Sequence, residues 1–304
     1  MKIGIVGSGQ LGMELFYRLN SQRHVNAYVY SRKNGFDAKR LEVAKEIVRS
    51  NDIVINCAAM TDVDECETHH QDAIEANVTL PQNLALLCQD NGVRFIHIST
   101  DFVYGNNNLD ITDGALEETD PCNPINFYGE TKLIADNYIE RNNEEYLILR
   151  PSWLFGISGK NNFIYKIIEK IKSKIEPLSV IDDQFGVPTS TSLVASIIEF
   201  WIDGKLENGL YNVRNAIDSD GCPSRYAIAS YVRDALKSHC EIKRCSSDEF
   251  IMKAKRQKNS FLSIDHLQSE MRRREIEKPR KLKGKNLEIP CWKDAINEYI
   301  NEIM

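Results

Sequence analysis

Two residues four apart in the sequence, Tyr128 and Lys132, carry side chains that together could protonate an oxygen. Positions i and i+4 lie on one face of an α-helix, so we expect the ammonium to lie near the phenol and to lower its pKa. Such a phenol can give its proton to an oxygen that is becoming an alkoxide while a hydride reaches the carbon. The same spacing also occurs on ordinary helices, where a half-buried tyrosine packs beside a solvated lysine.

A glycine-rich segment at the start of the chain predicts the site of a hydride donor. Gly7, Gly9 and Gly12 form the pattern G-x-G-x-x-G directly after an apolar strand and before a helical period. These glycines permit a tight turn and a close approach to a pyrophosphate, and the helix N-terminus favours the anion. We expect Gly7, Gly9, Gln10, Leu11 and Gly12 to bind a dinucleotide.

The end of the second expected strand bears on which dinucleotide binds. Ser31, Arg32 and Lys33 follow this strand, and no acidic residue appears before Asp37. An acid at this place takes the ribose 2′-hydroxyl of NAD, whereas arginine accommodates the 2′-phosphate of NADP. The sequence therefore favours NADPH and leaves NADH open.

Small residues close the third expected strand. Cys57, Ala58 and Ala59 follow residues 52–56 and would let a cofactor lie against the carboxyl edge of a sheet. Packing alone explains Cys57 equally well.

Apolar strands and amphipathic helices alternate through the first half of the chain. We expect strands at 3–6, 25–30, 52–56, 95–99 and 146–150, and helices at 11–19, 41–48, 71–90 and 127–140, with Pro81 kinking or restarting the third of these helices. This alternation predicts an α/β fold, a Rossmann-like doubly wound parallel sheet. Further helices are expected at 161–173, 191–202 and 223–238 and from residue 292.

The looser pattern after Trp153 predicts how the chain is divided. We expect a dinucleotide-binding domain at 1–155, to which part of 190–215 returns, and a smaller, interleaved substrate-binding region at 156–304. No linker of low complexity separates the two.

Composition excludes several classes of protein. The 304 residues are 42% hydrophobic and 27% charged, with a net charge of −6, so we expect no binding to nucleic acid or to a membrane surface. Eight cysteines without Cys-x-x-Cys spacing and a start without a signal peptide predict a cytoplasmic protein with reduced thiols. His69 and His70 lack ligand-spaced partners, so we expect no metal, and we leave a homodimer open.

Longer motifs carry a resemblance that spans nearly the whole chain. They lie at residues 9–12, 55–67, 98–103, 127–133, 149–156 and 161–163, and the most specific is Asp-Asp-Gln-Phe-Gly-Val-Pro-Thr at 182–189. With these motifs the sequence resembles the dTDP-4-dehydrorhamnose reductases, a family of extended short-chain dehydrogenases. The resemblance implies NAD(P)H-dependent reduction of the C4 keto group of a nucleotide-linked 6-deoxy sugar.

The resemblance also implies roles for particular residues. Tyr128 would protonate the sugar oxygen, Lys132 would hold the nicotinamide ribose, and Thr100 would orient the substrate carbonyl. It implies substrate contacts for five further residues: Val63, Phe102, Trp153, Gln184 and Arg256. A tryptophan packed at a strand end is an equally ordinary interpretation of Trp153.

Departures from the family pattern keep alternatives open. The glycine loop is one residue shorter than usual, and residues 105–114 lack the usual Pro-Tyr, which leaves the sugar and nucleotide open. One alternative is an epimerase or a dehydratase, although Asp101-Phe102 lacks the Asp-Glu doublet expected of a dehydratase. Another is a non-catalytic regulatory subunit similar to the methionine adenosyltransferase β subunit.

Overall fold

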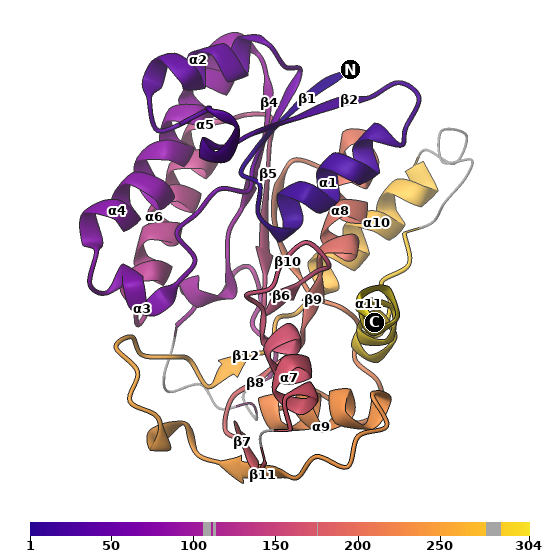
Figure 1. The fold of residues 1–304 in the computed structure, drawn as a ribbon. Helices are drawn as coiled ribbons and strands as arrows, with labels where there is room; N and C mark the ends of the chain where they lie inside the picture. Colours follow the sequence, from indigo (N-terminus) through magenta and orange to yellow (C-terminus); the bar gives the residue numbers. More distant parts are fainter. Residues whose placement is uncertain (106–110, 112–113, 175, 278–286) are drawn as a thin grey trace.

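A parallel six-stranded sheet forms the centre of the computed structural model (Figure 1). The structure describes residues 1–105, 111, 114–174, 176–277 and 287–304, so most of the segment 105–114 lies outside the described residues. The strands follow the order β10-β5-β4-β3-β1-β2, and every neighbouring pair is parallel. Their bounds are β1 Lys2–Val6, β2 Asn26–Tyr30, β3 Ile53–Asn56, β4 Arg94–Ile98, β5 Tyr146–Pro151 and β10 Gly209–Val213. The predicted α/β fold class is confirmed.

Helices cover both faces of the sheet, which explains why its strands are apolar throughout. On one face lie α1 (Gln10–Asn20), α8 (Thr191–Ile202) and α10 (Asp265–Glu277), and their side chains share a core with β1, β3 and β5. On the other face lie α2 (Leu41–Arg49), α5 (Leu80–Asn91) and α6 (Phe127–Asn142), with a second core. Both cores consist mainly of buried aliphatic side chains, with a few aromatic ones.

The sheet has a switch point beside β1. From β1 the chain crosses to β2 on one side, and β3 then lies on the other side of β1. In open α/β sheets ligands bind outside the carboxyl ends of the strands at such a point. The loops that follow β1, β3, β4 and β5 all leave from this edge, so it gathers most of the residues with expected chemical roles.

The C-terminal half adds a smaller layer beneath this edge. Helices α7 (Phe163–Lys172), α9 (Arg225–Ala235) and α11 (Trp292–Ile303) enclose a core of their own with the short parallel pair β7 (Leu178–Ile181) and β11 (Ile242–Cys245). Among the described residues, four further short strands lie in this half of the chain, namely β6 (Leu154–Phe155), β8 (Phe185–Gly186), β9 (Thr189–Ser190) and β12 (Asn259–Ser260). The sequence did not predict α10 or strand β10. The domain boundary at residue 155 stays a prediction.

The helix expected at 71–90 is unbroken but contains a wider turn. It runs through α4 (His70–Ile74), a π-helical segment (Glu75–Thr79) and α5 (Leu80–Asn91). Pro81 lies in the first turn of α5, so the disturbance falls immediately before the residue that lacks an amide donor. Single π-turns of this kind are frequent at functional sites.

No helix in the described ranges is long and apolar enough to cross a membrane.

The three glycines of the first loop meet different surroundings. Gly7 has a φ of +107°, and a Cβ there would lie 2.8 Å from the amide nitrogen of Ala58. A Cβ on Gly12 would lie 2.0 Å from the carbonyl oxygen of Gly7, whereas one on Gly9 would meet no atom within 4 Å. Gly7 and Gly12 therefore permit the turn and the packing of α1, and Gly9 leaves space beside the loop.

Replacing Gly12 should destabilise the protein. The Gly12→Ala variant should lose about 1–3 kcal/mol of unfolding free energy, as overpacked sites do, because its Cβ would overlap the Gly7 carbonyl. Urea denaturation measures this loss. Gly9→Ala is the matched control, because its φ of −75° suits alanine, and its stability should change by less than about 0.5 kcal/mol. Equal losses in the two variants would contradict this account.

Candidate active site

The first turn of α1 presents its backbone to the open space beside Gly9. The Gln10 side chain is turned away, because its Nε2 donates to the Leu154 carbonyl oxygen at 3.1 Å. Leu11 is buried in the sheet core. These two residues can therefore offer only backbone groups to a ligand. A helix N-terminus with free space in front of it fits a pyrophosphate.

The residues after β2 form a short capped turn. Ser31 caps the 3₁₀ helix Arg32–Asn34, and the Asn34 side chain accepts from the Ser31 amide at 2.8 Å. Arg32 and Lys33 are exposed. Neither forms an ion pair with a described carboxylate. The turn thus holds two uncompensated cations at the edge where the adenosine ribose of a dinucleotide is expected.

The loop after β3 is held from below by Asn56. Its Oδ1 accepts from the Ala58 amide at 3.2 Å, which fixes the small residues Cys57, Ala58 and Ala59 in their turn. Burial raises the pKa of the Cys57 thiol to about 12, so this thiol stays protonated. Small size, rather than thiol chemistry, is what Cys57 contributes here.

Asn77, to which sequence reasoning gave no role, ties this loop to α6. It lies in the π-helical segment and is fully buried. Its side chain accepts from the Met60 amide at 2.8 Å and donates to the Met60 carbonyl and the Thr131 hydroxyl, both at 3.1 Å. The asparagine before the helix-disturbing Pro81 was the available signal.

Thr100 and Tyr128 meet at the carboxyl end of β4. The Thr100 hydroxyl donates to Asp101 Oδ1 at 3.1 Å and caps the 3₁₀ helix Asp101–Val103. Burial raises the pKa of Tyr128 above its usual range, and hydrogen bonding to the Thr100 side chain opposes that rise. The phenol is therefore protonated at neutral pH and lies beside the hydroxyl with which it was expected to act.

The expected lowering of the Tyr128 pKa by Lys132 is not found. Lys132 is 1% exposed, and its Nζ donates to the Ile98 carbonyl oxygen at 2.7 Å and lies 2.9 Å from His97 Nε2. Its ammonium is thus held against β4, and the burial of Tyr128 dominates the pKa of the phenol. Burial also lowers the pKa of Lys132 itself, to about 8.

His97 is a second residue that sequence reasoning missed. It is fully buried, its Nδ1 lies 3.2 Å from Asn56 Nδ2, and burial holds its pKa well below the usual range. It therefore connects Lys132 to the loop after β3 as a neutral imidazole. A single imidazole in an otherwise apolar strand was the signal in the sequence.

Two of the expected substrate residues lie against Tyr128. Val63, which begins α3 (Val63–Cys66), and Phe102 both pack in the small apolar cluster that contains Tyr128. The Phe102 ring meets the Tyr128 ring edge-on, with 5.7 Å between the centroids. These side chains form a partly buried apolar wall beside the phenol.

Trp153 and Gln184 lie together around a residue that the sequence did not indicate, Arg225. The Arg225 guanidinium lies over the Trp153 ring at 4.1 Å, and its Nε donates to Gln184 Oε1 at 2.8 Å. Gly186 makes room for the indole, because a Cβ there would lie 3.0 Å from Trp153 Cζ2. One indole face is therefore already covered by a cation.

The remaining expected substrate residue, Arg256, is bound to a carboxylate. Its Nη2 lies 3.2 Å from Asp64 Oδ2, and its Nη1 donates to the Ala254 carbonyl at 2.7 Å. The next residue, Gln257, donates to Asp101 Oδ2 at 3.0 Å and so reaches the catalytic edge. Sequence reasoning assigned no role to Gln257.

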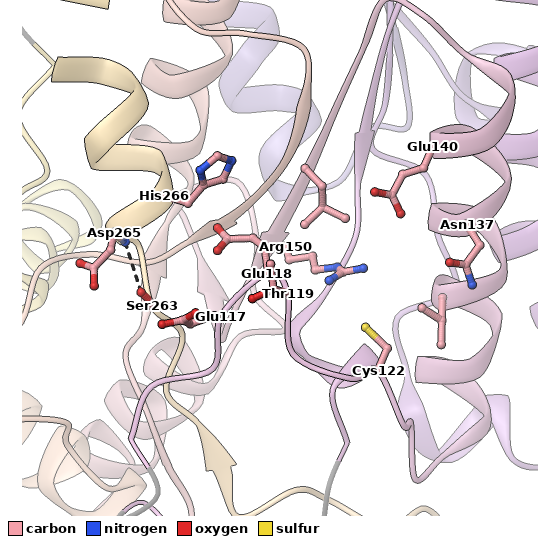
Figure 2. A pocket seen from close by; sticks show the side chains of 12 residues that line it. Glu117, Glu118, Thr119, Cys122, Asn137, Glu140, Arg150, Ser263, Asp265 and His266 are labelled. Atoms are coloured by element: carbon pink, nitrogen blue, oxygen red, sulfur yellow. Dashed lines mark hydrogen bonds between the residues drawn. The ribbon is translucent and has the colours of Figure 1, made fainter. Parts of the chain in front are cut away.

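A separate cavity of about 690 Å³ lies between α6 and α10 (Figure 2). Its walls include Glu140 of α6, Arg150 of β5 and His266 of α10, and neither Tyr128 nor Lys132 lines it. Arg150 reaches inward from this wall to the buried Asp136, with Nε 3.0 Å from Oδ2. This cavity is therefore not the site at the carboxyl edge.

Among the residues that the structure describes, no three His, Cys, Asp or Glu side chains gather as a metal site would require. The expectation that the protein binds no metal stays a prediction.

Known proteins resemble this chain over its full length. A dTDP-4-dehydrorhamnose reductase of Escherichia coli K12 is 29% identical, over 97% of this chain and 95% of its own. The structure of a dTDP-4-dehydrorhamnose reductase from Bacillus anthracis in complex with NADP has a TM-score of 0.85 and 28% identity, and covers 99% of both chains. A dTDP-4-dehydrorhamnose reductase from Clostridium acetobutylicum has a TM-score of 0.84 and 29% identity, over 100% of this chain and 99% of its own.

The match that decides the family covers almost the whole chain. Residues 1–303 match the model of the RmlD substrate binding domain. The motifs that carry the resemblance in the sequence thus belong to one continuous relationship rather than to separate local similarities. The chain belongs to the RmlD substrate binding domain family.

Proposed function

We propose that this chain uses NADPH to reduce the 4-keto group of a nucleotide-linked 6-deoxy-4-keto sugar, for the synthesis of a deoxysugar-containing polysaccharide or metabolite. The observation that carries the proposal is the meeting of Thr100, Tyr128 and Lys132 beside the glycine loop, at the switch point of the sheet. Relatives that span the whole chain and bear the name dTDP-4-dehydrorhamnose reductase support it.

The residues at the carboxyl edge fit a dinucleotide. The space beside Gly9 suits a pyrophosphate, and the small residues at 57–59 suit a nicotinamide ribose. The free cations Arg32 and Lys33 suit a 2′-phosphate. When bound, NADPH supplies the hydride. We propose that Lys132 then holds the nicotinamide ribose.

The protein itself would supply one proton and the orientation of the substrate. Tyr128 is protonated at neutral pH because burial raises its pKa, and so it can donate to the sugar oxygen. In this structure the Thr100 hydroxyl donates its one proton to Asp101 Oδ1 at 3.1 Å, and it would turn that proton to the sugar oxygen and so fix the position of the oxygen when substrate binds. Val63 and Phe102 would exclude water from the phenol.

The intact cluster favours a reductase over a regulatory subunit and over a dehydratase. A regulatory subunit has no need of a buried lysine held beside a protonated phenol, and Phe102 stands where a dehydratase would carry its second acid. Oxidation of NADPH when a nucleotide-linked 4-keto-6-deoxy sugar is added distinguishes turnover from mere binding. A cytoplasmic location and a homodimer stay predictions.

The first test of the mechanism removes the phenolic hydroxyl. Tyr128→Phe should lower turnover of a dTDP-4-keto-6-deoxyhexose by roughly 10²–10⁴, the usual contribution of a positioned acid. Turnover is measured as NADPH oxidation. Tyr138→Phe removes a hydroxyl from the same helix outside the site and should turn over normally. Near-normal turnover by Tyr128→Phe would refute the proposed acid.

Cofactor preference is tested at Arg32. Arg32→Ala should weaken NADPH binding by roughly 10- to 100-fold, the value of a charged hydrogen bond, and leave NADH binding unchanged. Fluorescence titration with each cofactor measures both constants. Arg23→Ala, at the opposite end of β2 and also exposed, is the control. Tighter binding of NADH than of NADPH by the unaltered protein would contradict the preference.

The burial of Lys132 predicts a pH dependence of stability. Its pKa is about 8 in the folded protein and 10.5 ordinarily, so between these values the unfolded chain binds more protons than the folded one. The free energy of unfolding gains from this residue a component that rises with pH across that interval, by at most about 1.4 kcal/mol per pH unit. In Lys132→Met, the free energy of unfolding measured by urea denaturation should lack this rise with pH. Parallel pH profiles for the two proteins would show that Lys132 is not the source.

A further inference from the structure

Arg225, the first residue of α9, stacks on an aromatic platform formed by Trp153 and Phe163. Its guanidinium lies 4.1 Å from the centre of the Trp153 ring and 5.0 Å from that of Phe163. Its Nε donates to Gln184 Oε1 at 2.8 Å. Three side chains from three separate segments, namely the loop after β5, α7 and the loop before β8, therefore surround this guanidinium, while the residue stays partly exposed.

The other two nitrogens of Arg225 have no partner. No described group accepts a hydrogen bond from Nη1 or Nη2, and no described carboxylate lies within ion-pair distance. The buried Arg150 differs, because Asp136 and the Tyr104 hydroxyl bind it and raise its pKa above the usual range. Burial of the Arg225 guanidinium instead lowers its pKa, to about 10. A desolvated cation of this kind is stabilised by an incoming anion.

The carboxylate with the largest effect on Arg225 is already in use. Asp101 accepts from the Thr100 hydroxyl at 3.1 Å and from Gln257 Nε2 at 3.0 Å. Its charge acts on Arg225 without forming an ion pair. Because Asp101 directly follows Thr100, this interaction places the guanidinium near the catalytic edge.

Three features distinguish this aromatic platform from ordinary core packing. Trp153 has a φ of +45°, a region that bulky residues rarely adopt and that costs about 1–3 kcal/mol. Gly186 leaves the space in which the indole lies. Gln184 is 3% exposed, and its Nε2 has no hydrogen-bond partner in the described structure. The backbone conformation of Trp153 and the missing Cβ at Gly186 together let the indole lie beneath Arg225.

We propose that Arg225 binds the pyrophosphate of the nucleotide sugar through its free Nη1–Nη2 edge. A planar guanidinium stacked on an aromatic ring presents two parallel donors that match two phosphate oxygens. Arg256, the other arginine near this edge, already lies 3.2 Å from Asp64 and is less available to an anion. The inference rests on the proposed function, since it assigns the subsite of that same substrate.

The test compares the binding of nucleoside diphosphates in the absence of turnover. Calorimetry first identifies which of dTDP, UDP and GDP the unaltered protein binds most tightly. Arg225→Gln should weaken the binding of that diphosphate by roughly 10- to 100-fold. Arg225→Lys keeps the charge and loses the two parallel donors. Its affinity for the diphosphate should lie between those of the unaltered protein and of Arg225→Gln. NADPH affinity should be unchanged in both variants, which shows that they are folded.

Arg244→Gln is the matched control. Arg244 also stacks on an aromatic ring, that of Tyr226, with 4.5 Å to the centroid, but its Nη1 already lies 3.0 Å from Asp182 Oδ2. This variant should bind the diphosphate like the unaltered protein.

Three results overturn the inference. Equal diphosphate affinity in the Arg225→Gln variant and the unaltered protein refutes it, even where turnover of a keto sugar falls, because the arginine would then contact the sugar. Weakening by the Arg244→Gln control as large as that by Arg225→Gln also refutes it, because the loss would then not belong to the free edge of Arg225. An unaltered protein that binds none of the three diphosphates refutes the proposed function together with the inference, whereas the first two results leave the proposed function intact.

Discussion

The burial of Lys132 is the constraint on which the catalytic half of the fold depends. An ammonium that is 1% exposed must be hydrogen-bonded, and its two partners, the Ile98 carbonyl and His97, both belong to the end of β4. Helix α6 can therefore lie against β4 in only one rotation. Tyr128, one turn earlier on the same face, is then directed at Thr100, which follows that strand.

The next turn of the same face extends this arrangement into the sheet. Asp136 is fully buried and accepts from Ser99 at 2.7 Å and from Arg150 at 3.0 Å, which joins α6 to both β4 and β5. Arg150 in turn donates to the Tyr104 hydroxyl. Positions 128, 132 and 136 thus place on one helical stripe the phenol, the lysine and the carboxylate that anchors the helix. The chemistry and the packing of α6 cannot be altered independently.

The sequence predicted those features that depend on local pattern. Alternating apolar strands and a glycine loop of fixed spacing are sufficient for a doubly wound sheet, because each reflects the geometry of a short segment. Contacts between distant segments left weaker signals. Asn77 acts through a π-turn, His97 through a partner 35 residues away, and Gln257 through Asp101, so none could be assigned a place from its neighbours in the chain. Helix α10 was missed because its sequence is strongly polar and its few apolar residues, such as Leu267 and Met271, are enough to pack it on the sheet.

The two arginines near the catalytic edge show why residue type alone does not identify an anion site. The resemblance implies a substrate contact for Arg256, but this arginine is already paired with Asp64 within the protein, with 3.2 Å between Nη2 and Oδ2. Arg225 matches no motif, and its surroundings leave it stacked, partly desolvated and without a carboxylate at ion-pair distance. What an arginine offers to a ligand is the part of its hydrogen-bonding capacity that the fold has not already used. That remainder depends on side chains from the loop before β8, from α7 and from the loop after β5, and only the folded chain brings these together.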